Sequence, residues 1–463
     1  MAADPLPSIS GRRYHRDPIE MIATTHAPET LTERAILRFW APLAATWLMM
    51  SVEGPFIAAV IARLHDPEYN LAAFGVAFSF ALLVESPIVM ALSAATALVR
   101  DRPSFLTLRR FIYSLNVSIT VAMLVLLAPP VFRRIMVDLV GLPVPVARLT
   151  HLAMAVLLPW PAAIGYRRFY QGVLVRHKLT RRVAYGTVVR LTSMTAVAVL
   201  LGTLSPLPGV CVGAAALSAG VVMEAMATRL MARHVVRDLL GGTASQDRGI
   251  PPLTTGRVVW FYYPLALTSI LSFGINPLIS LFLGHSRLPV ESLAVLPVVM
   301  SLLLLFRSGG IAYQEVAIAL LGDRGEHFAP LAAFARKLGG LVTLGLAVVA
   351  FTPLSTVWFQ RVSGLSAELA TLALLPIRIL TLMPALEVLL SLERGLLVHA
   401  HRTRRITWAT VVEVATVVGV LLVGVAGFEL VGVVAASLGL LLGRIASTGF
   451  LAGPALGRAA RRA

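Results

Sequence analysis

Apolar residues are grouped along the chain in long runs that are separated by short polar segments. A transmembrane helix needs about 20 consecutive, mostly apolar residues. Twelve runs meet this requirement and predict twelve membrane-spanning helices. They cover residues 36–62, 71–98, 109–132, 148–175, 183–204, 209–236, 257–283, 290–320, 333–357, 368–398, 406–426 and 430–452. Several runs contain internal proline, which predicts kinked or tilted helices.

One polar stretch inside the chain is much longer than the others. Residues 238–256 are rich in Gly, Ser, Thr and Pro, and six of the apolar runs lie on each side of them. This composition is typical of a linker. The expected organisation is therefore a disordered cytoplasmic tail without a signal-peptide core (1–34), an N-lobe (35–237), a cytoplasmic linker (238–256), a C-lobe (257–453) and a basic cytoplasmic tail (454–463).

The second half of the chain repeats the first. Phe39–Ser86 has a counterpart at an offset of 222 in the numbering, with no gap across two apolar runs. The matching residues are Pro42 and Pro264, Pro55 and Pro277, Leu71 and Leu293, Ser79 and Ser301, and Ser86 and Ser308. Further on, Gly172–Arg182 matches Gly395–Arg405 at an offset of 223. Six helices per repeat is an even number, so both repeats enter the membrane in the same direction and are related by an axis along the membrane normal. The predicted fold class is an all-α polytopic membrane protein with two six-helix lobes related by this pseudo-two-fold axis.

Composition and charge agree with a membrane protein. Hydrophobic residues make up 57% of the chain and charged residues 14%, and the mean hydropathy is +0.82. The net charge of +17 could indicate nucleic-acid binding, but 28 of the 40 Lys and Arg residues lie at the termini or in the loops on the same predicted side. Only six lie in the opposite loops. Positive loops mark the cytoplasmic side, so this pattern excludes nucleic acid as a partner and predicts a multi-pass protein of the plasma (inner) membrane with both termini cytoplasmic.

Several kinds of chemistry are excluded by the residues present. Cys211 is the single cysteine, so the chain forms no internal disulfide and no cysteine-based zinc or iron–sulfur site. The chain contains no Gly-rich phosphate-binding motif ending in Lys, and therefore has no ATP-driven motor of its own. No nucleophile and base are arranged for catalysis. We expect no enzymatic activity, no cofactor and no bound metal.

Four short motifs resemble those of a known transporter family. They are Leu71–Ser79, Gly172–Lys178, Pro376–Leu380 and Pro264–Leu267. With the six-plus-six helices, they resemble the progressive ankylosis (ANK) family within the multidrug/oligosaccharidyl-lipid/polysaccharide (MATE-like) exporter superfamily, over about residues 35–455. The resemblance implies a MATE-like, alternating-access exporter whose second and eighth helices line the cleft between the lobes. It also implies anionic substrates such as pyrophosphate, nucleotide or citrate.

The repeat places an acid opposite a base at one position inside the membrane. Glu85 in the second helix corresponds to Arg307 in the eighth. Charges inside the bilayer are costly and are normally paired or face an aqueous cavity. Two interpretations follow. The residues pair across the pseudo-two-fold axis in one state of the transport cycle and form a gate or binding site, or each pairs within its own lobe.

The last two helices of each lobe also carry exchanged charges. Arg190 corresponds to Glu413, and Glu224 corresponds to Arg444 if a short gap is allowed. The favoured interpretation is a structural ion pair within each lobe, Arg190 with Glu224 and Glu413 with Arg444. The alternative is a role in transport. Arg167, Arg168, Glu393 and Arg394 lie near the predicted cytoplasmic ends of their helices, where long side chains can extend to the interface.

Candidate substrate-binding residues are Arg307, Arg378, Glu85 and Asn276. Arg378 lies six residues before Pro384, and arginine at a bent helix suits phosphate or carboxylate. The alternative for the arginines is neutralisation by Glu387 or Glu53. Glu53 resembles the cation-coupling carboxylate of related multidrug exporters, with Ile275 at its counterpart position and Asn276 alongside. Glu53, Glu85, Arg307 and Glu387 are therefore the candidates for coupling or gating.

The functional hypothesis is a secondary transporter that exports a small organic or phosphate-bearing anion, driven by a proton or sodium gradient and acting as a monomer in the lipid bilayer. The alternatives are a cation-coupled multidrug exporter and a lipid-linked glycan flippase. The shape of the cavity distinguishes these functions. An anion exporter should have a compact basic cavity, a drug exporter an acidic aromatic one, and a flippase a long lateral groove with a basic floor.

Overall fold

The computed structural model describes residues 31–459, except 178, 242–252, 323–324 and 400–401. Twelve helical spans in this part of the chain are long and apolar enough to cross a membrane, which confirms the prediction. They are Glu33–Ala62, Pro67–Leu98, Arg102–Leu127, Val144–Arg176, Arg181–Leu204, Gly209–Met231, Thr255–Gly284, Pro289–Leu320, Phe328–Phe351, Ala367–Val398, Arg404–Gly427 and Gly432–Gly453. Most of the predicted tails and of the linker lie outside the described residues. The last helix of the N-lobe ends at Gly241, inside the predicted linker, and the next helix begins at Thr255.

The individual helices are shorter than the spans because several spans are interrupted. In the N-lobe they are α1 (Glu33–Ser51), α2 (Glu53–Ala62), α3 (Pro67–Glu85), η2 (Ser86–Ile88), α4 (Ala91–Leu98), α5 (Arg102–Leu127), α6 (Pro129–Arg133), η3 (Arg134–Leu139), α7 (Val144–Val156), α8 (Pro159–Arg176), α9 (Thr180–Leu204), α10 (Gly209–Met231) and α11 (Arg233–Gly241). In the C-lobe they are α12 (Thr255–Gly284), α13 (Pro289–Leu320), α14 (Phe328–Phe351), α15 (Leu354–Thr356), η4 (Val357–Val362), α16 (Ala367–Ile379), η5 (Leu380–Leu382), α17 (Met383–His399), α18 (Thr403–Leu421), η6 (Leu422–Gly427) and α19 (Gly432–Ala459).

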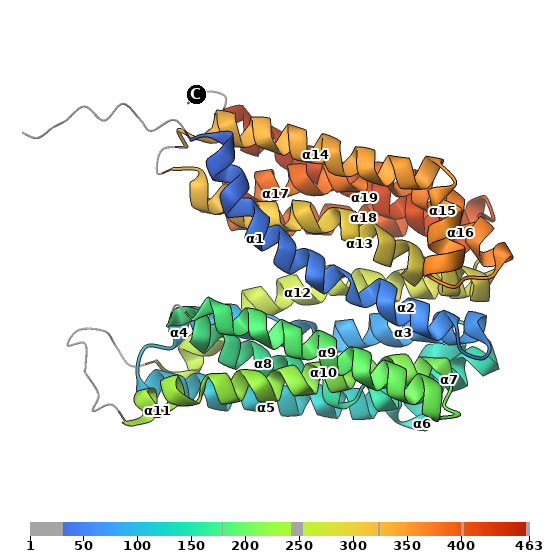
Figure 1. Ribbon diagram of the computed structural model, residues 1–463, viewed down its shortest axis with the longest axis horizontal. Coiled ribbons are helices and arrows are strands. Elements are labelled where there is room, and N and C mark those ends of the chain that lie inside the picture. The colour runs from blue at the N-terminus through green and yellow to red at the C-terminus, as the bar shows by residue number, and fades with distance from the viewer. Residues whose placement is uncertain (1–30, 178, 242–252, 323–324, 400–401, 460–463) are drawn as a thin grey trace, which may run out of the picture.

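Two helical bundles lie side by side and diverge toward the end that holds both termini (Figure 1). Their backbones repeat each other in detail. The left-handed residues Asp66 and Leu288 precede the second and eighth spans and are related by the offset of 222. The π-helical segments η3 and η4 are related by the offset of 223, and each is followed by a glycine with positive φ, Gly141 and Gly364. Because such backbone conformations are uncommon, their recurrence at matching positions shows that the internal repeat extends to the fold.

Interruptions of the spans follow the prolines only in part. The second span leaves the α-helical path at η2, which contains Pro87, and the first span breaks at Val52, three residues before Pro55. Proline removes a backbone donor and disturbs the preceding turn. In contrast, Pro264 and Pro277 lie inside the unbroken helix α12. The first span is thus divided into α1 and α2, whereas its repeat is continuous.

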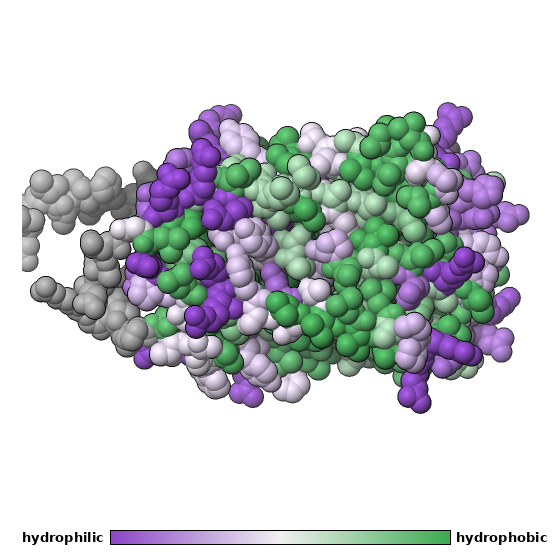
Figure 2. Space-filling model, turned by 90° about the horizontal axis from the view of Figure 1, so that it is seen from below, coloured by the Kyte–Doolittle hydropathy of each residue, from purple (hydrophilic) through white to green (hydrophobic). Residues whose placement is uncertain are grey.

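The surface is divided into an apolar belt and two polar ends (Figure 2). Large apolar side chains are exposed along the outer helices, as in α5, α9 and α14. A bilayer accepts such a belt because its interior is itself apolar. This pattern places the molecule across the membrane with its termini at one polar end.

The first helix of each lobe crosses to the other lobe. Helix α1 packs against α13 and α14 of the C-lobe, and its continuation α2 packs against α3 and α10 of the N-lobe as well as against α13. In the same way α12 packs against α3, α5 and η2 of the N-lobe as well as α18 and α19 of its own lobe. At the end away from the termini, Arg63 donates hydrogen bonds to the carbonyl oxygens of Arg361 (2.6 Å) and Val362 (2.9 Å), which joins the lobes there.

Candidate functional site

A cavity of about 290 Å³ lies between the two lobes. Nineteen of its 23 lining residues belong to the repeated stretches 39–86 and 261–308. Eight pairs of lining residues are related by the offset of 222: Gly54 and Asn276, Ile57 and Ile279, Ala58 and Ser280, Phe74 and Leu296, Gly75 and Pro297, Phe78 and Met300, Ser79 and Ser301, and Leu82 and Leu304. The cavity therefore lies on the pseudo-two-fold axis, and the repeated stretch forms both of its walls.

Small residues allow these walls to approach each other. A Cβ atom on Gly75 would lie 3.2 Å from the carbonyl oxygen of Leu293, and one on Gly54 would lie 3.2 Å from the Cβ of Ser301. Both glycines are helical, so close packing rather than backbone conformation requires them. Across the same interface the hydroxyl oxygens of Ser79 and Ser280 are 3.2 Å apart and form a hydrogen bond between α3 and α12.

The two walls differ in chemistry although they are related in position. On the N-lobe side Phe78 stacks on Phe74 and contacts Trp160, each with ring centroids 5.7 Å apart. The C-lobe side presents the polar groups of Asn276, Ser280 and Ser301. The Asn276 side chain donates to the carbonyl oxygen of Phe273 (3.3 Å), four residues before Pro277. A proline at that position leaves this carbonyl without its helical donor, so Asn276 also supports the helix.

Among the described residues that line the cavity, the charged ones are Glu53 and Arg190. Glu53 is the first residue of α2, next to the break at Val52, and it is 7% exposed. The Arg190 guanidinium, from α9, donates a hydrogen bond to Oε2 of Glu53. The other carboxylate oxygen of Glu53, Oε1, is buried and has no hydrogen-bond partner in the described part of the chain.

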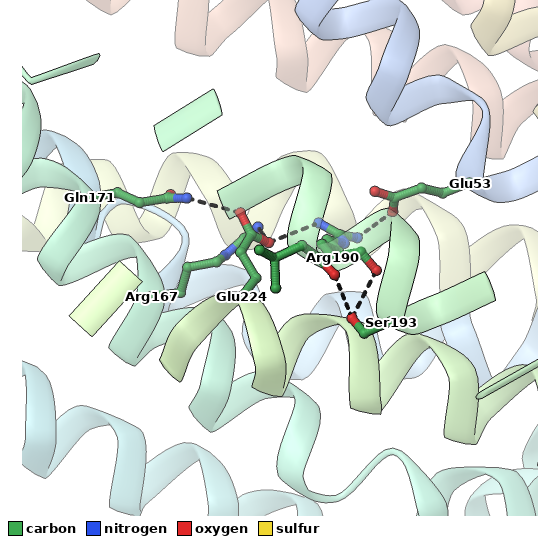
Figure 3. Close-up of polar contacts among 7 residues, drawn as sticks. Glu53, Arg167, Gln171, Arg190, Ser193 and Glu224 are labelled. Carbon is green, nitrogen blue, oxygen red and sulfur yellow. Dashed lines mark hydrogen bonds and ion pairs between the residues drawn. The ribbon is translucent and has the colours of Figure 1, made fainter. Parts of the chain in front are cut away.

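Behind this pair, Glu224 on α10 is the centre of a buried polar network (Figure 3). Arg167 donates to its Oε2, and Gln171 donates to its Oε1 at 3.1 Å. Nη1 of Arg190 lies 3.9 Å from Oε2 of Glu224. Arg190 is thus placed between two carboxylates, one in the cavity wall and one in the lobe interior. The predicted contact between Arg190 and Glu224 is present, although Glu53 is the nearer partner of Arg190.

The C-lobe contains a second buried network, centred on Glu387 of α17. Arg307 donates to Oε2 of Glu387 from Nε (2.9 Å) and Nη2 (2.5 Å), and Nη1 of Arg444 lies 3.5 Å from the same oxygen. Nη2 of Arg444 is 3.1 Å from Oε1 of Glu413. These residues are absent from the described lining of the central cavity. They hold α13, α17, α18 and α19 together inside the lobe.

Glu85 and Arg307 do not pair with each other in the observed arrangement, and a pair in another state of the transport cycle stays a prediction. Arg307 pairs with Glu387 in its own lobe. Glu85 is 4% exposed at the end of α3, its Oε2 has no hydrogen-bond partner in the described residues, and its strongest charged neighbour is Arg168. The pseudo-two-fold axis explains this arrangement. A side chain that turns into the C-lobe has a counterpart that turns into the N-lobe, so the two charges face away from each other.

Arg378, which was nominated as an anion-binding residue, lies outside the described cavity lining in this arrangement. Its side chain is exposed, its Nε donates to the carbonyl oxygen of Ala350 (3.2 Å), and its guanidinium lies 5.8 Å from the centre of the Phe351 ring. Arg378 is therefore held between α16 and α14, outside the described cavity lining. Neither Glu387 nor Glu53 is its partner in these contacts.

Sequence reasoning placed two further residues incorrectly and missed others. Arg167 and Glu393 are 4% and 0% exposed, so they do not extend to the interface as expected. Phe74, Phe78 and Trp160 in the cavity wall were not singled out. The offset of 222 could have found the first two, because they lie inside the repeated stretch. Trp160 lies outside it and carries no such signal.

Comparisons with known proteins identify the fold. Neither the protein-family models nor the curated proteins give a match to this chain. Among solved structures it is similar to an inward-facing multidrug resistance MATE family transporter of the MOP superfamily, with a TM-score of 0.71 and 15% identity over 92% of this chain and 98% of that one.

Two further solved structures belong to the same set of matches. A MOP superfamily transporter from Pyrococcus furiosus, described as having a binding pocket of reverse polarity, gives a TM-score of 0.68 and 16% identity over 92% of this chain and 96% of that one. The lipid II flippase MurJ, in an inward closed conformation, gives a TM-score of 0.68 and 12% identity over 89% of this chain and 87% of that one. The chain therefore has the twelve-helix, two-lobed MATE-like fold.

Proposed function

We propose that this protein is an alternating-access secondary transporter for small amphipathic organic molecules. The observation that carries the proposal is the cavity on the pseudo-two-fold axis, with one ion pair at the break of the first span. The names of the similar structures, transporters and a flippase, support membrane transport. Membership of the ANK family rests on the short motifs alone.

The cavity favours an amphipathic substrate over a multiply charged anion. Its walls are largely aromatic and aliphatic, and Arg190, its basic side chain, is already bound to Glu53. Pyrophosphate, nucleotide or citrate would have to be desolvated there without enough cationic partners, at a cost of several kcal/mol. An apolar body can instead contact Phe74, Phe78 and Trp160, while a single polar group reaches Ser280, Ser301 or Asn276. This favours the multidrug alternative over the anion hypothesis.

Glu53 and Arg190 form the ion-coupled switch of this proposal, because Arg190 has two carboxylates within reach. When Glu53 is ionised, its Oε2 accepts a hydrogen bond from Arg190. Protonation of Glu53 removes that attraction, and Arg190 then needs to move only a short way to pair fully with Glu224, now 3.9 Å away. The change occurs beside Val52, where the first span is broken. Proton binding is thereby linked to the angle between α1 and α2.

The same proposal includes an orientation. Lys and Arg are concentrated in the termini and in the loops at the same end of the molecule, which favours a cytoplasmic location for both termini. We infer that the protein acts as a monomer in the plasma (inner) membrane.

Transport can be tested in proteoliposomes that carry an imposed pH or sodium gradient. The panel should contain an amphipathic cation, an amphipathic neutral compound, an amphipathic monocarboxylate and pyrophosphate. We expect gradient-driven movement of at least one amphipathic compound, no movement of pyrophosphate, and loss of the gradient dependence in Glu53→Gln. Glu315→Gln is the matched control, because Glu315 is an exposed acid of α13 outside the described cavity lining.

Two results would overturn the proposal. Movement of pyrophosphate without movement of the amphipathic compounds would restore the anion hypothesis. Equal gradient dependence in the native protein and Glu53→Gln would show that the ion pair in the cavity is not the coupling site.

A further inference from the structure

Two hydrogen bonds join the lobes at positions that the internal repeat makes equivalent. The indole Nε1 of Trp40, on α1, donates to the carbonyl oxygen of Gly309 on α13 at 2.9 Å. The hydroxyl of Tyr262, on α12, donates to the carbonyl oxygen of Pro87 in η2 at 2.7 Å. The two donors are related by the offset of 222, and so are the two acceptors. Each bond runs from the first helix of one repeat to the second helix of the other.

The surroundings of the two bonds match as well. The Trp40 ring meets the Phe334 ring edge to face, with centroids 6.0 Å apart, and the Tyr262 ring meets Phe111 in the same way at 5.1 Å. Phe111 and Phe334 are themselves related by the offset of 223. Each motif therefore consists of an aromatic donor, a backbone acceptor in the opposite lobe and an edge-to-face phenylalanine from that lobe.

The residue before each acceptor is also the same in both motifs. The hydroxyls of Ser86 and Ser308 each donate to the carbonyl oxygen three residues earlier, at 2.7 Å in both cases. The donors, in contrast, differ in chemistry, since one is an indole and the other a phenol. The arrangement is thus maintained between the two repeats although the residue types are not, which indicates that the contact itself matters.

These two contacts lie where the first helix of each lobe crosses to the other lobe. Trp40 ties α1 to the C-lobe, while α2, beyond the break at Val52, packs on the N-lobe. Tyr262 is 2% exposed and ties the beginning of α12 to the N-lobe, while the rest of α12 reaches the C-lobe. A rotation that moves α1 with the N-lobe, or α12 with the C-lobe, must break these two attachments. Both lie on the side of the cavity that holds the termini.

We propose that Trp40 and Tyr262 are a pair of interlobe latches that stabilise the observed arrangement of the lobes and open together when the lobes change arrangement. Neither side chain lines the described cavity, so both act on the arrangement of the lobes and do not contact substrate there. The role of the latches in transport rests on the proposed function. The equilibrium between the two arrangements of the lobes, in contrast, can be measured without substrate. A hydrogen bond made in one arrangement and lost in the other biases their ratio roughly two- to tenfold.

The test measures distances between spin labels by double electron–electron resonance in lipid nanodiscs. Arg181→Cys with Arg404→Cys reports the end that holds the termini, and Val144→Cys with Ala367→Cys reports the opposite end. All four sites are exposed, and each pair is related by the offset of 223. The single native cysteine, Cys211, is buried and is replaced by alanine in every sample.

Tyr262→Phe and Trp40→Phe remove the donors but keep a ring against Phe111 and Phe334. We expect each to lower the population of the observed arrangement by roughly two- to tenfold, with shorter 181–404 and longer 144–367 distances, and the double variant to lower it by the product of the two factors. Tyr263→Phe and Trp260→Phe are the matched controls, because those side chains are 62% and 81% exposed. The controls should leave the distributions unchanged.

Unchanged distributions in both latch variants would overturn the proposal, and so would a shift in only one of them, because the latches are proposed to act as a pair. Thermal unfolding of each sample separates a change of arrangement from a loss of folded protein. If the distance distributions shift as expected but no compound is transported, the proposed function is wrong and the latch proposal is supported. If transport is observed and the distributions do not shift, the latches alone fail.

Discussion

Each lobe contains a buried chain of two arginines and two glutamates, but only the chain of the N-lobe reaches the cavity. In the N-lobe, Arg190 links Glu53 in the cavity wall to Glu224 in the interior. In the C-lobe, Arg307 and Arg444 both converge on Glu387, away from the described lining. One end of the N-lobe network therefore lies in the cavity wall, where a ligand or proton can reach it. All four residues of the C-lobe network pair with one another away from the described cavity lining.

The difference arises from a few positions within a symmetric backbone. Glu53 has Ile275 as its counterpart, so the C-lobe lacks an acid at the first helix. Arg307 has Glu85 as its counterpart, so the N-lobe lacks a base at the second helix. A buried ion pair contributes little net stability, but removal of one partner is strongly destabilising. Removal of the central acid of the C-lobe network should therefore be costly, whereas in the N-lobe network Oε1 of Glu53 has no hydrogen-bond partner among the described residues.

The largest effect should come from removing the centre of the C-lobe network. Glu387→Gln leaves Arg307 buried without its carboxylate partner, while Arg444 keeps Glu413. We expect a loss of about 3–5 kcal/mol in the free energy of unfolding, measured by equilibrium unfolding in mixed micelles. Glu53→Gln is the comparison, because Arg190 retains Glu224, and its loss should be about 1 kcal/mol. Equal losses in the two variants would contradict the difference between the networks.

The second prediction tests whether the lobes are electrostatically independent at their second helices. Glu85→Arg places a like charge near Arg168, and Arg307→Glu places one against Glu387. Each should destabilise by about 2–4 kcal/mol. Because each charge faces its own lobe, the loss of unfolding free energy in the double variant should equal the sum of the losses in the two single variants within about 0.5 kcal/mol. Rescue in the double variant would show that the two residues meet in another arrangement of the lobes.

The sequence predicts the fold better than the site because the two depend on different signals. Span lengths, the linker and the repeat at an offset of 222 are one-dimensional patterns, and the span Pro289–Leu320 was predicted from them to within one residue. The family resemblance implied that the second and eighth helices line the cleft between the lobes, and residues of both helices line the observed cavity.

The pairing partners of the buried charged residues could not be predicted from such one-dimensional patterns. A helix turns by about 100° per residue, so adjacent residues face different neighbours, and the length of an apolar run does not fix the rotation of the helix about its axis. Arg167 and Arg168 are adjacent, yet Arg167 reaches Glu224 and Arg168 interacts with Glu85. Arg378 was expected at a bend inside the cleft. The bend is present at η5, but Arg378 lies on the outer face of α16, where it contacts α14.

The smallest effect is expected at Arg378. This variant compares a charge on the outer surface of a lobe with the buried charges inside the lobes. Its counterpart in the N-lobe is Ala155, so Arg378→Ala makes the two repeats alike at this position. The variant loses one hydrogen bond to a backbone carbonyl and a cation–π contact with Phe351, which together contribute about 1 kcal/mol in an exposed setting. Transport in proteoliposomes should be unchanged, because the guanidinium lies outside the described cavity lining. A loss of transport with stability retained would instead place Arg378 on the substrate path.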